Sequence, residues 1–155
     1  MSELRLIPAL RPGETFPGGA YKTQRHYWDL VVDGRSLRSY LPAPGDEIPP
    51  IGWGTDAWHA EALAEFLLER PSSLPTDRRP ILVCPECGDL GCQTLTAVIE
   101  QIDGLIMWRA FAYQNNWDAG LTPIDIPAFS FDLEAYRMVF TDAAFLGRDA
   151  QENGT

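Results

Sequence analysis

Every cysteine of this chain lies in one short segment, Cys84-Pro-Glu-Cys-Gly-Asp-Leu-Gly-Cys92. Cys84 and Cys87 form a C-x-x-C pair, in which two thiolates on one tight turn can chelate a single metal ion. The glycine after Cys87 lets the backbone direct its N–H groups toward the sulfurs. Cys92 follows a flexible spacer and can supply a third thiolate. The spacing therefore predicts a zinc site that still needs a fourth ligand.

Three other residues are candidates for that fourth ligand. Asp89 lies within the cysteine segment, whereas His26 and His59 must arrive from other parts of the fold. A second C-x-x-C pair, which would complete a four-cysteine site, does not occur in the sequence. Each histidine also has an ordinary structural interpretation, because His59 lies on the flank of an expected helix, beside Phe66, and His26 lies beside Tyr27 and Trp28 in an expected strand.

Two other interpretations of the cysteine segment remain open. A thiol–disulfide exchanger places its C-x-x-C motif at a helix N-terminus, where the helix dipole lowers the pKa of the first thiol. Here the following residues predict a turn and then a strand, and Glu86 and Asp89 are expected to raise the thiol pKa values. The simplest interpretation is a glycine-rich connection between strands, whose thiols pack as small hydrophobic groups.

The charge balance narrows the classes of partner. The chain carries 22 acidic and 12 basic residues, a formal net charge of -10. Such a surface repels nucleic acid and anionic lipid and favours a basic protein partner. The sequence has no long apolar run and no secretory signal pattern, and its clustered cysteines cannot join distant elements. We therefore expect a cytoplasmic protein that binds neither nucleic acid nor membrane.

Two groups of residues are candidates for binding a protein partner. The first is a row of carboxylates on one face of an expected helix: Glu61, Glu65 and Glu69. The second is an aromatic and amide-rich stretch: Tyr113, Asn115, Asn116 and Trp117. The ordinary alternatives are a solvated helix face and a turn made by the two asparagines, with Trp108 and Phe111 in the core.

These observations favour a non-enzymatic, acidic protein-binding domain, such as an immunity protein that neutralises a basic toxin. No nucleophile elbow, P-loop, dinucleotide fingerprint, HExxH motif or Ca²⁺ loop occurs in the sequence. The alternatives are a thiol-based redox protein or enzyme that uses the three cysteines, and a protein with a structural zinc site.

The secondary structure that positions these residues is expected to be mixed. Hairpins are predicted around Asp33-Gly34 and Asp103-Gly104, because Asp-Gly accepts the positive φ angles of a tight turn. Shorter strands are predicted at residues 4–10, in the segment before Cys84 and near residues 128–131. One helix is predicted over residues 56–70, with an N-cap at Thr55 or Asp56 and a stop at Pro71, and its apolar face is expected to comprise Ala60, Leu63, Ala64, Leu67 and Leu68. A second helix is expected to begin at Asp132 and to end before Gly147.

This order predicts an α+β fold, a mostly antiparallel sheet built from two β-hairpins with two helices packed on it. We expect a single domain over residues 1–150 and a frayed C-terminal tail at residues 151–155.

The segments CPECGDLGC and FAYQNNW together resemble a family of small uncharacterised bacterial proteins. That family carries a C-P-x-C-G-D-x-G-C segment and a downstream F-x-Y-x-N motif, and the resemblance covers roughly residues 81–117. It implies that the cysteine turn and the asparagine-containing loop belong together. Members are sometimes labelled oxidoreductases without an established activity, so the resemblance supplies no catalytic residue.

Overall fold

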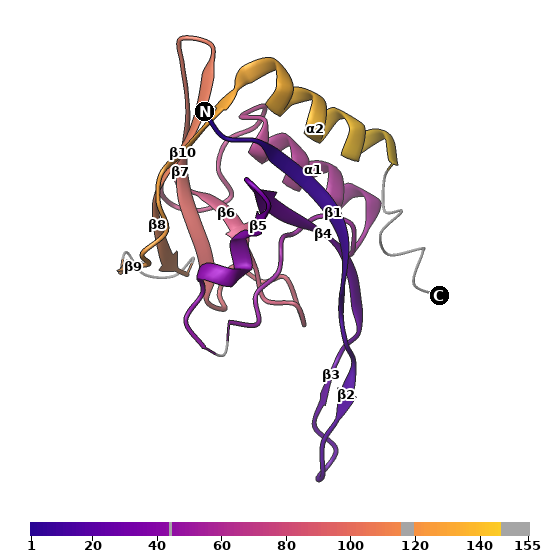
Figure 1. Ribbon diagram of the computed structural model, residues 1–155. Coiled ribbons are helices and arrows are strands. Elements are labelled where there is room, and N and C mark those ends of the chain that lie inside the picture. Colours follow the sequence, from indigo (N-terminus) through magenta and orange to yellow (C-terminus); the bar gives the residue numbers. More distant parts are fainter. Residues whose placement is uncertain (44, 116–119, 147–155) are drawn as a thin grey trace.

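The computed structural model describes residues 1–43, 45–115 and 120–146 (Figure 1). It confirms the α+β fold, since its strands pair antiparallel throughout and two α-helices accompany them. The strands are β1 Leu4–Arg11, β2 Glu14–Thr15, β3 Tyr21–Lys22, β4 Arg25–Val32, β5 Arg35–Ser36, β6 Arg79–Leu82, β7 Thr94–Ile102, β8 Leu105–Gln114, β9 Thr122–Pro123 and β10 Phe129–Asp132. The helices are the 3-10 helix η1 Leu37–Tyr40, α1 Asp56–Phe66 and α2 Leu133–Leu146.

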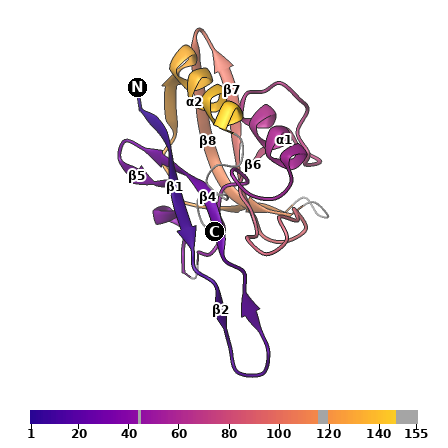
Figure 2. The ribbon, with the colours of Figure 1, turned by 90° about the vertical axis from the view of Figure 1, so that its right-hand side faces the viewer.

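The first sheet has the order β1-β4-β5. The predicted Asp-Gly turn is confirmed, with φ of 51° at Asp33 and 82° at Gly34. The main partner of β4 is the N-terminal strand β1, which pairs with it from Leu4↔Val32 to Arg11↔Arg25. Beyond this pairing, the chain continues into β2 and β3, which form an arm that extends from the body of the molecule (Figures 1 and 2).

The second sheet has the order β10-β8-β7-β6, with β9 also paired to β8. Its central hairpin turns at Asp103-Gly104, as predicted, again with positive φ at both residues. A register shift interrupts the β7–β8 pairing, and Ala110 opposite it has φ of 55°. Arg78 fills this irregularity, donating from Nε to the Thr96 hydroxyl at 2.9 Å and from its guanidinium to the Ala110 carbonyl. The buried guanidinium thereby satisfies backbone groups that the shift leaves unpaired.

One large hydrophobic core joins both sheets to the two helices. Helix α2 contacts β1, β8 and β10 and lies beside α1 (Figure 2). At the centre, the Trp108 indole N–H donates to the Tyr136 hydroxyl at 3.2 Å, and that hydroxyl donates to the Phe66 carbonyl at 2.6 Å. Phe140 stacks on the Phe66 ring with a centroid distance of 4.9 Å. The polar tips of Trp108 and Tyr136 at the centre of the core are therefore hydrogen-bonded.

Helix α1 begins as predicted and ends earlier than predicted. The Thr55 side chain accepts a hydrogen bond from the Trp58 N–H, which confirms it as N-cap. The helix ends at Phe66 because Leu68 adopts a left-handed conformation, with φ of 58°. The Leu68 and Glu69 N–H groups then donate to carbonyls of the last turn, as in a Schellman motif. The predicted end near Pro71 is therefore wrong.

The buried face of α1 is also rotated relative to the prediction. Its buried residues are His59, Leu63, Glu65 and Phe66, whereas Ala60 is exposed. The prediction for α2 is better, because the Asp132 carboxylate accepts the Ala135 N–H at 2.9 Å and so caps the helix. The predicted end at Gly147 and the tail at 151–155 lie outside the described residues. Neither helix is long and apolar enough, over the residues described, to cross a membrane.

Candidate metal centre

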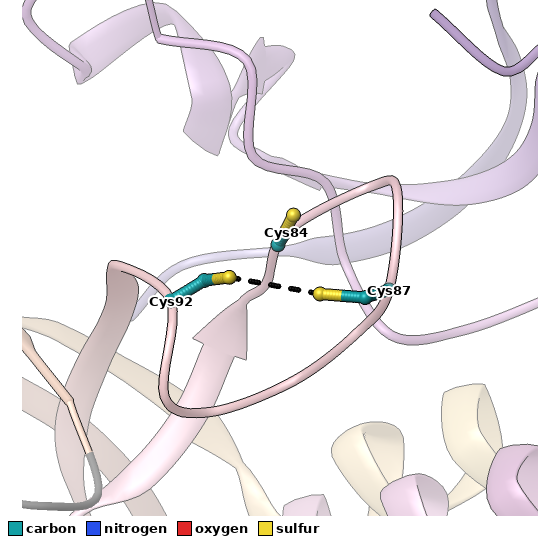
Figure 3. A group of neighbouring side chains, drawn as sticks. All are labelled: Cys84, Cys87 and Cys92. Carbon is teal, nitrogen blue, oxygen red and sulfur yellow. Dashed lines mark hydrogen bonds between the residues drawn. The ribbon is translucent and has the colours of Figure 1, made fainter.

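The three thiols converge in the loop between β6 and β7 (Figure 3). Val83, the residue before Cys84, pairs with Ile48 in an isolated antiparallel bridge, which fixes the start of the loop. The sulfur atoms of Cys84, Cys87 and Cys92 all lie within 4.8 Å of one another. Cys87 Sγ and Cys92 Sγ are 3.6 Å apart, well beyond the disulfide bond length of about 2.05 Å. All three cysteines are free.

The turn around Cys87 has the backbone geometry that the C-x-x-C motif predicts. The Gly88 N–H donates to the Cys84 carbonyl at 2.8 Å, and the Asp89 N–H donates to Cys87 Sγ at 3.4 Å. Gly88 has φ of 67°, in the left-handed region. A Cβ atom at this position would also lie 2.8 Å from Trp58 Cζ2. Glycine is therefore required here by the backbone conformation and by the neighbouring ring.

The backbone also sets the protonation of the thiols. Burial alone would raise the pKa of Cys84, but hydrogen bonds from the backbone N–H groups of Cys87 and Glu86 outweigh it and lower this pKa. The hydrogen bond with Cys87, followed by burial and the nearby thiols, raises the pKa of Cys92 to about 12. The expectation that acidic neighbours raise the thiol pKa values is thus wrong for Cys84. The preferred thiolate lies where the backbone donors converge.

Glu86 has little effect on the thiols because its carboxylate is bound elsewhere. Arg11 donates to Glu86 Oε1 at 2.7 Å, and the backbone N–H and hydroxyl of Thr23 donate to the same carboxylate. Burial opposes ionisation, yet these hydrogen bonds lower the pKa of Glu86 to about 2. Arg11 also makes a two-pronged contact with Asp46, at 3.1 and 2.7 Å. One buried arginine of β1 therefore holds both the cysteine loop and the loop that contains Asp46.

A second arginine and a small hydrophobic cluster also contact the cysteine loop. Arg25 Nε donates to the Pro85 carbonyl at 2.8 Å, and its guanidinium lies over the Trp53 ring. The cluster consists of Tyr27, Ile48, Trp53 and Val83, with Ala9, Trp58 and Leu90 packed against it. This cluster is separate from the large core, so the cysteine loop packs on a hydrophobic cluster of its own.

The donor set and spacing fit a tetrahedral metal ion. Metal–sulfur distances of about 2.3 Å separate two thiolates by about 3.8 Å, close to the 3.6 Å between Cys87 Sγ and Cys92 Sγ. The N–H donors directed at Cys84 and Cys87 also stabilise anionic sulfur. The three cysteines can therefore hold a metal ion.

The structure does not bring the predicted fourth ligands to the thiols. Within the part of the chain that it describes, the group of ligand atoms contains cysteines alone. The Asp89 carboxylate accepts the Gly91 N–H at 2.8 Å and so closes the turn. His59 is buried, with Nδ1 accepting the Gly52 N–H at 3.0 Å and Nε2 3.4 Å from the Ala143 carbonyl. His26 Nε2 lies 3.1 Å from the Gln24 amide nitrogen.

The predicted partner-binding residues also do not lie together on the surface. Glu65 is only 6% exposed, and its carboxylate accepts hydrogen bonds from the Ser73 N–H and hydroxyl and pairs with Arg79 at 3.7 Å. The prediction of an exposed Glu61–Glu65–Glu69 row is therefore wrong at its centre, because Glu65 ties the helix to the segment that follows it. Glu61 is exposed and lies 3.3 Å from Arg70, and Glu69 is exposed beyond the end of α1.

The aromatic stretch differs from its prediction in a similar way. Trp108 and Phe111 are core residues, as expected, but Tyr113 is buried as well, so its assignment to a surface patch is wrong. Its hydroxyl interacts electrostatically with Glu47, a residue that the sequence did not single out, and burial together with this interaction raises the pKa of Tyr113. Asn115 is half-buried, and Asn116 and Trp117 lie outside the described residues.

A pocket of about 300 Å³ lies against the cysteine cluster. Its wall includes Cys84 and Cys92 together with Asp46, Glu47 and Tyr113. The chain segments that meet here are the loop after η1, the cysteine loop and the end of β8. A glutamate in a proline-rich loop and a tyrosine near a strand end carry no local sequence signal of such a meeting, which is why the sequence did not predict it.

Comparison with known proteins assigns neither a family nor a function to the chain. No known protein family matches the chain, and no solved structure matches it. A Pescadillo homolog of Aspergillus terreus is 43% identical over 42 residues, which is 27% of this chain and 6% of that protein. A Pescadillo homolog of Coccidioides immitis is 44% identical over 43 residues, or 28% and 6%. The similarity thus spans about 6% of the length of each relative.

Proposed function

We propose that this chain is a zinc-binding protein, in which Cys84, Cys87 and Cys92 hold one Zn²⁺ ion. The observation that carries the proposal is the approach of all three sulfur atoms to within 4.8 Å of one another. Thiolate sulfur favours zinc over magnesium, calcium or manganese, which prefer oxygen ligands. The backbone N–H groups that face the sulfurs supply the outer hydrogen bonds that metal thiolates use.

The metal in this proposal stabilises the loop between β6 and β7. Among the described residues, this loop packs on the small hydrophobic cluster and not on the large core. Arg11 and Arg25 hold it by hydrogen bonds. An ion that binds three points of a nine-residue segment removes conformational freedom from it. The free energy of metal binding then adds to the free energy of folding.

Metal analysis combined with native mass spectrometry of the full chain tests this proposal. We expect one zinc ion per chain, and a chelator should lower both the metal content and the unfolding temperature. Cys84→Ser and Cys87→Ser should each lose the metal, whereas the control Gln93→Ser introduces serine beside the cluster and should retain it. A chain that takes up no zinc with all three thiols reduced would contradict the proposal. Zinc-free chains that cycle between thiol and disulfide would favour the redox alternative.

Binding of a basic protein, as by an immunity protein that neutralises a basic toxin, is a second candidate function. The net charge of -10 supports it, since charge complementarity speeds association with a cationic surface. Affinity purification at low and moderate salt tests it. We expect a basic partner whose recovery falls as salt rises, and recovery of salt-insensitive background alone would contradict it.

A further inference from the structure

The pocket beside the cysteine cluster contains an acidic group with an unfilled hydrogen-bonding position. Glu47 Oε2 is buried and has no hydrogen-bond partner among the described residues. A buried carboxylate oxygen without a donor is destabilising, so this position favours a group that brings an N–H or O–H. Glu47 lines the pocket together with Cys84 and Cys92. A donor that enters the pocket therefore meets the carboxylate and the thiols together.

Tyr113 and Arg38 hold Glu47 in place. Burial, together with the charge of Glu47, raises the pKa of Tyr113 to about 12, so its hydroxyl remains protonated at neutral pH and is available as a donor beside the carboxylate. Arg38 Nε donates to the Glu47 carbonyl at 2.7 Å, and its guanidinium donates to the Gly45 carbonyl at 3.3 Å. The position of Glu47 is thus set by strand β8 and by helix η1.

Among the described residues, Glu47 is also the acidic wall residue that makes no ion pair. The other one, Asp46, is bound by both prongs of Arg11. Glu47 does not belong to the group of ligand atoms within 4.8 Å of one another, so its carboxylate lies more than 4.8 Å from at least one of the three sulfurs, and both line the same pocket. A flat ring that coordinates at one edge and donates at the other matches this arrangement. Imidazole has both properties, because metal-bound imidazoles donate their second ring N–H to a carboxylate.

We propose that this pocket binds an imidazole-bearing ligand, whose one ring nitrogen completes the metal site and whose other ring nitrogen donates to Glu47. The inference rests on the proposed zinc site. The chain's own imidazoles are engaged elsewhere, His59 with Gly52 and His26 beside Gln24, so the ring comes from outside the chain. A tetrahedral site with three protein ligands keeps its fourth position for such an external ligand.

The test uses the full chain loaded with Co²⁺ in place of Zn²⁺, because the visible absorption of cobalt reports a change of its fourth ligand. Imidazole is titrated against 1-methylimidazole, which coordinates equally well but has no second ring N–H. We expect imidazole to bind about tenfold more tightly, the effect of one hydrogen bond to a charged acceptor. Glu47→Gln should reduce this preference to about twofold or less, while Glu134→Gln, which removes an exposed carboxylate of α2, should preserve it.

The outcomes separate the two proposals. A chain that takes up no cobalt overturns the metal site and this inference together. A chain that shows cobalt–thiolate absorption but no response to imidazole overturns the inference alone, as does equal binding of imidazole and 1-methylimidazole by the unaltered chain. Titration with N-acetylhistidine amide then identifies the source: tighter binding than imidazole indicates a histidine of a peptide, and weaker binding indicates a small molecule. Either result supports the inference.

Discussion

The large core and the cysteine loop are stabilised by different forces. In the core, Phe66, Trp108, Tyr136 and Phe140 pack ring against ring, with little water contact and few charges. In the cysteine loop, by contrast, guanidinium groups bind carboxylates and backbone carbonyls, and the three sulfurs lie close together at the surface. The difference indicates that the core defines the fold, whereas the loop depends on specific polar contacts and, in our proposal, on a metal ion.

The largest effect is expected from a cavity in the core. Phe140→Ala removes a fully buried ring that stacks on Phe66, and should lower the free energy of unfolding by about 3–5 kcal/mol. The control is Met138→Ala on the same helix, where the side chain is 63% exposed and the loss should stay within about 0.5 kcal/mol. Denaturant unfolding measures both. If the comparison is right, the folded fraction of Phe140→Ala still binds one metal ion per chain, and loss of the metal would show that the regions are coupled.

A smaller and more local effect is expected at Arg11. Arg11→Gln removes a buried cation from Asp46 and Glu86, at a cost of about 1–2 kcal/mol because both partners are partly exposed. Hydrogen exchange should then accelerate at the Gly88 and Cys92 N–H groups and remain slow across β7 and β8. Arg5→Gln, an exposed position on the same strand, is the control and should change neither. Equal acceleration in the sheet would mean that the loop has no independent stability.

Gly88→Ala examines the turn itself. A left-handed alanine costs about 1–2 kcal/mol, and its Cβ would also collide with the Trp58 ring. Zinc affinity should fall by about tenfold, since each 1.4 kcal/mol is a factor of ten. Gly104→Ala is matched to it, because Gly104 has φ of 78° and open space around its Cβ position. This control should lose stability to a similar backbone strain and keep its zinc affinity; a parallel loss of affinity would refute the local explanation.

The smallest effects are expected from substitutions of two glutamates that lie one turn apart on α1. Glu65→Gln weakens buried contacts with Ser73 and Arg79 and should cost about 1 kcal/mol. Glu61→Gln disrupts an exposed pair with Arg70 and should cost about 0.3 kcal/mol. Thermal unfolding in low and high salt distinguishes them, since only the exposed pair is strongly screened. Equal costs would mean that burial adds nothing at Glu65.

The features that depend on neighbouring residues could be predicted from the sequence. Both Asp-Gly turns, the Thr55 and Asp132 caps and the C-x-x-C turn each follow from a few adjacent residues. The start of α1 could be predicted correctly for the same reason. Its buried face could not, because Glu65 is drawn inward by Ser73 and Arg79, which lie beyond the helix.

The candidate site shows the same division. Three thiols in one segment are visible in the sequence, but the absence of a nearby histidine is not, because His59 is committed to Gly52 only once the loop before α1 has folded. Glu47 and Tyr113 come from a loop and a strand that are far apart along the chain. No local pattern indicates that they meet, and a patch of exposed residues was predicted where Tyr113 is in fact buried.

Arg11 has a consequence for the order of folding. The cysteine turn closes through a bond between residues four positions apart, Gly88 and Cys84, whereas Arg11 reaches Asp46 across 35 positions and Glu86 across 75. Contacts over long separations form late, since the entropy of closing the chain must be overcome first. The thiols can therefore gather while much of the chain is still unstructured, and the neighbouring pocket is completed only when the N-terminal strand docks. We expect metal capture to precede ligand binding during refolding, as two separate kinetic phases.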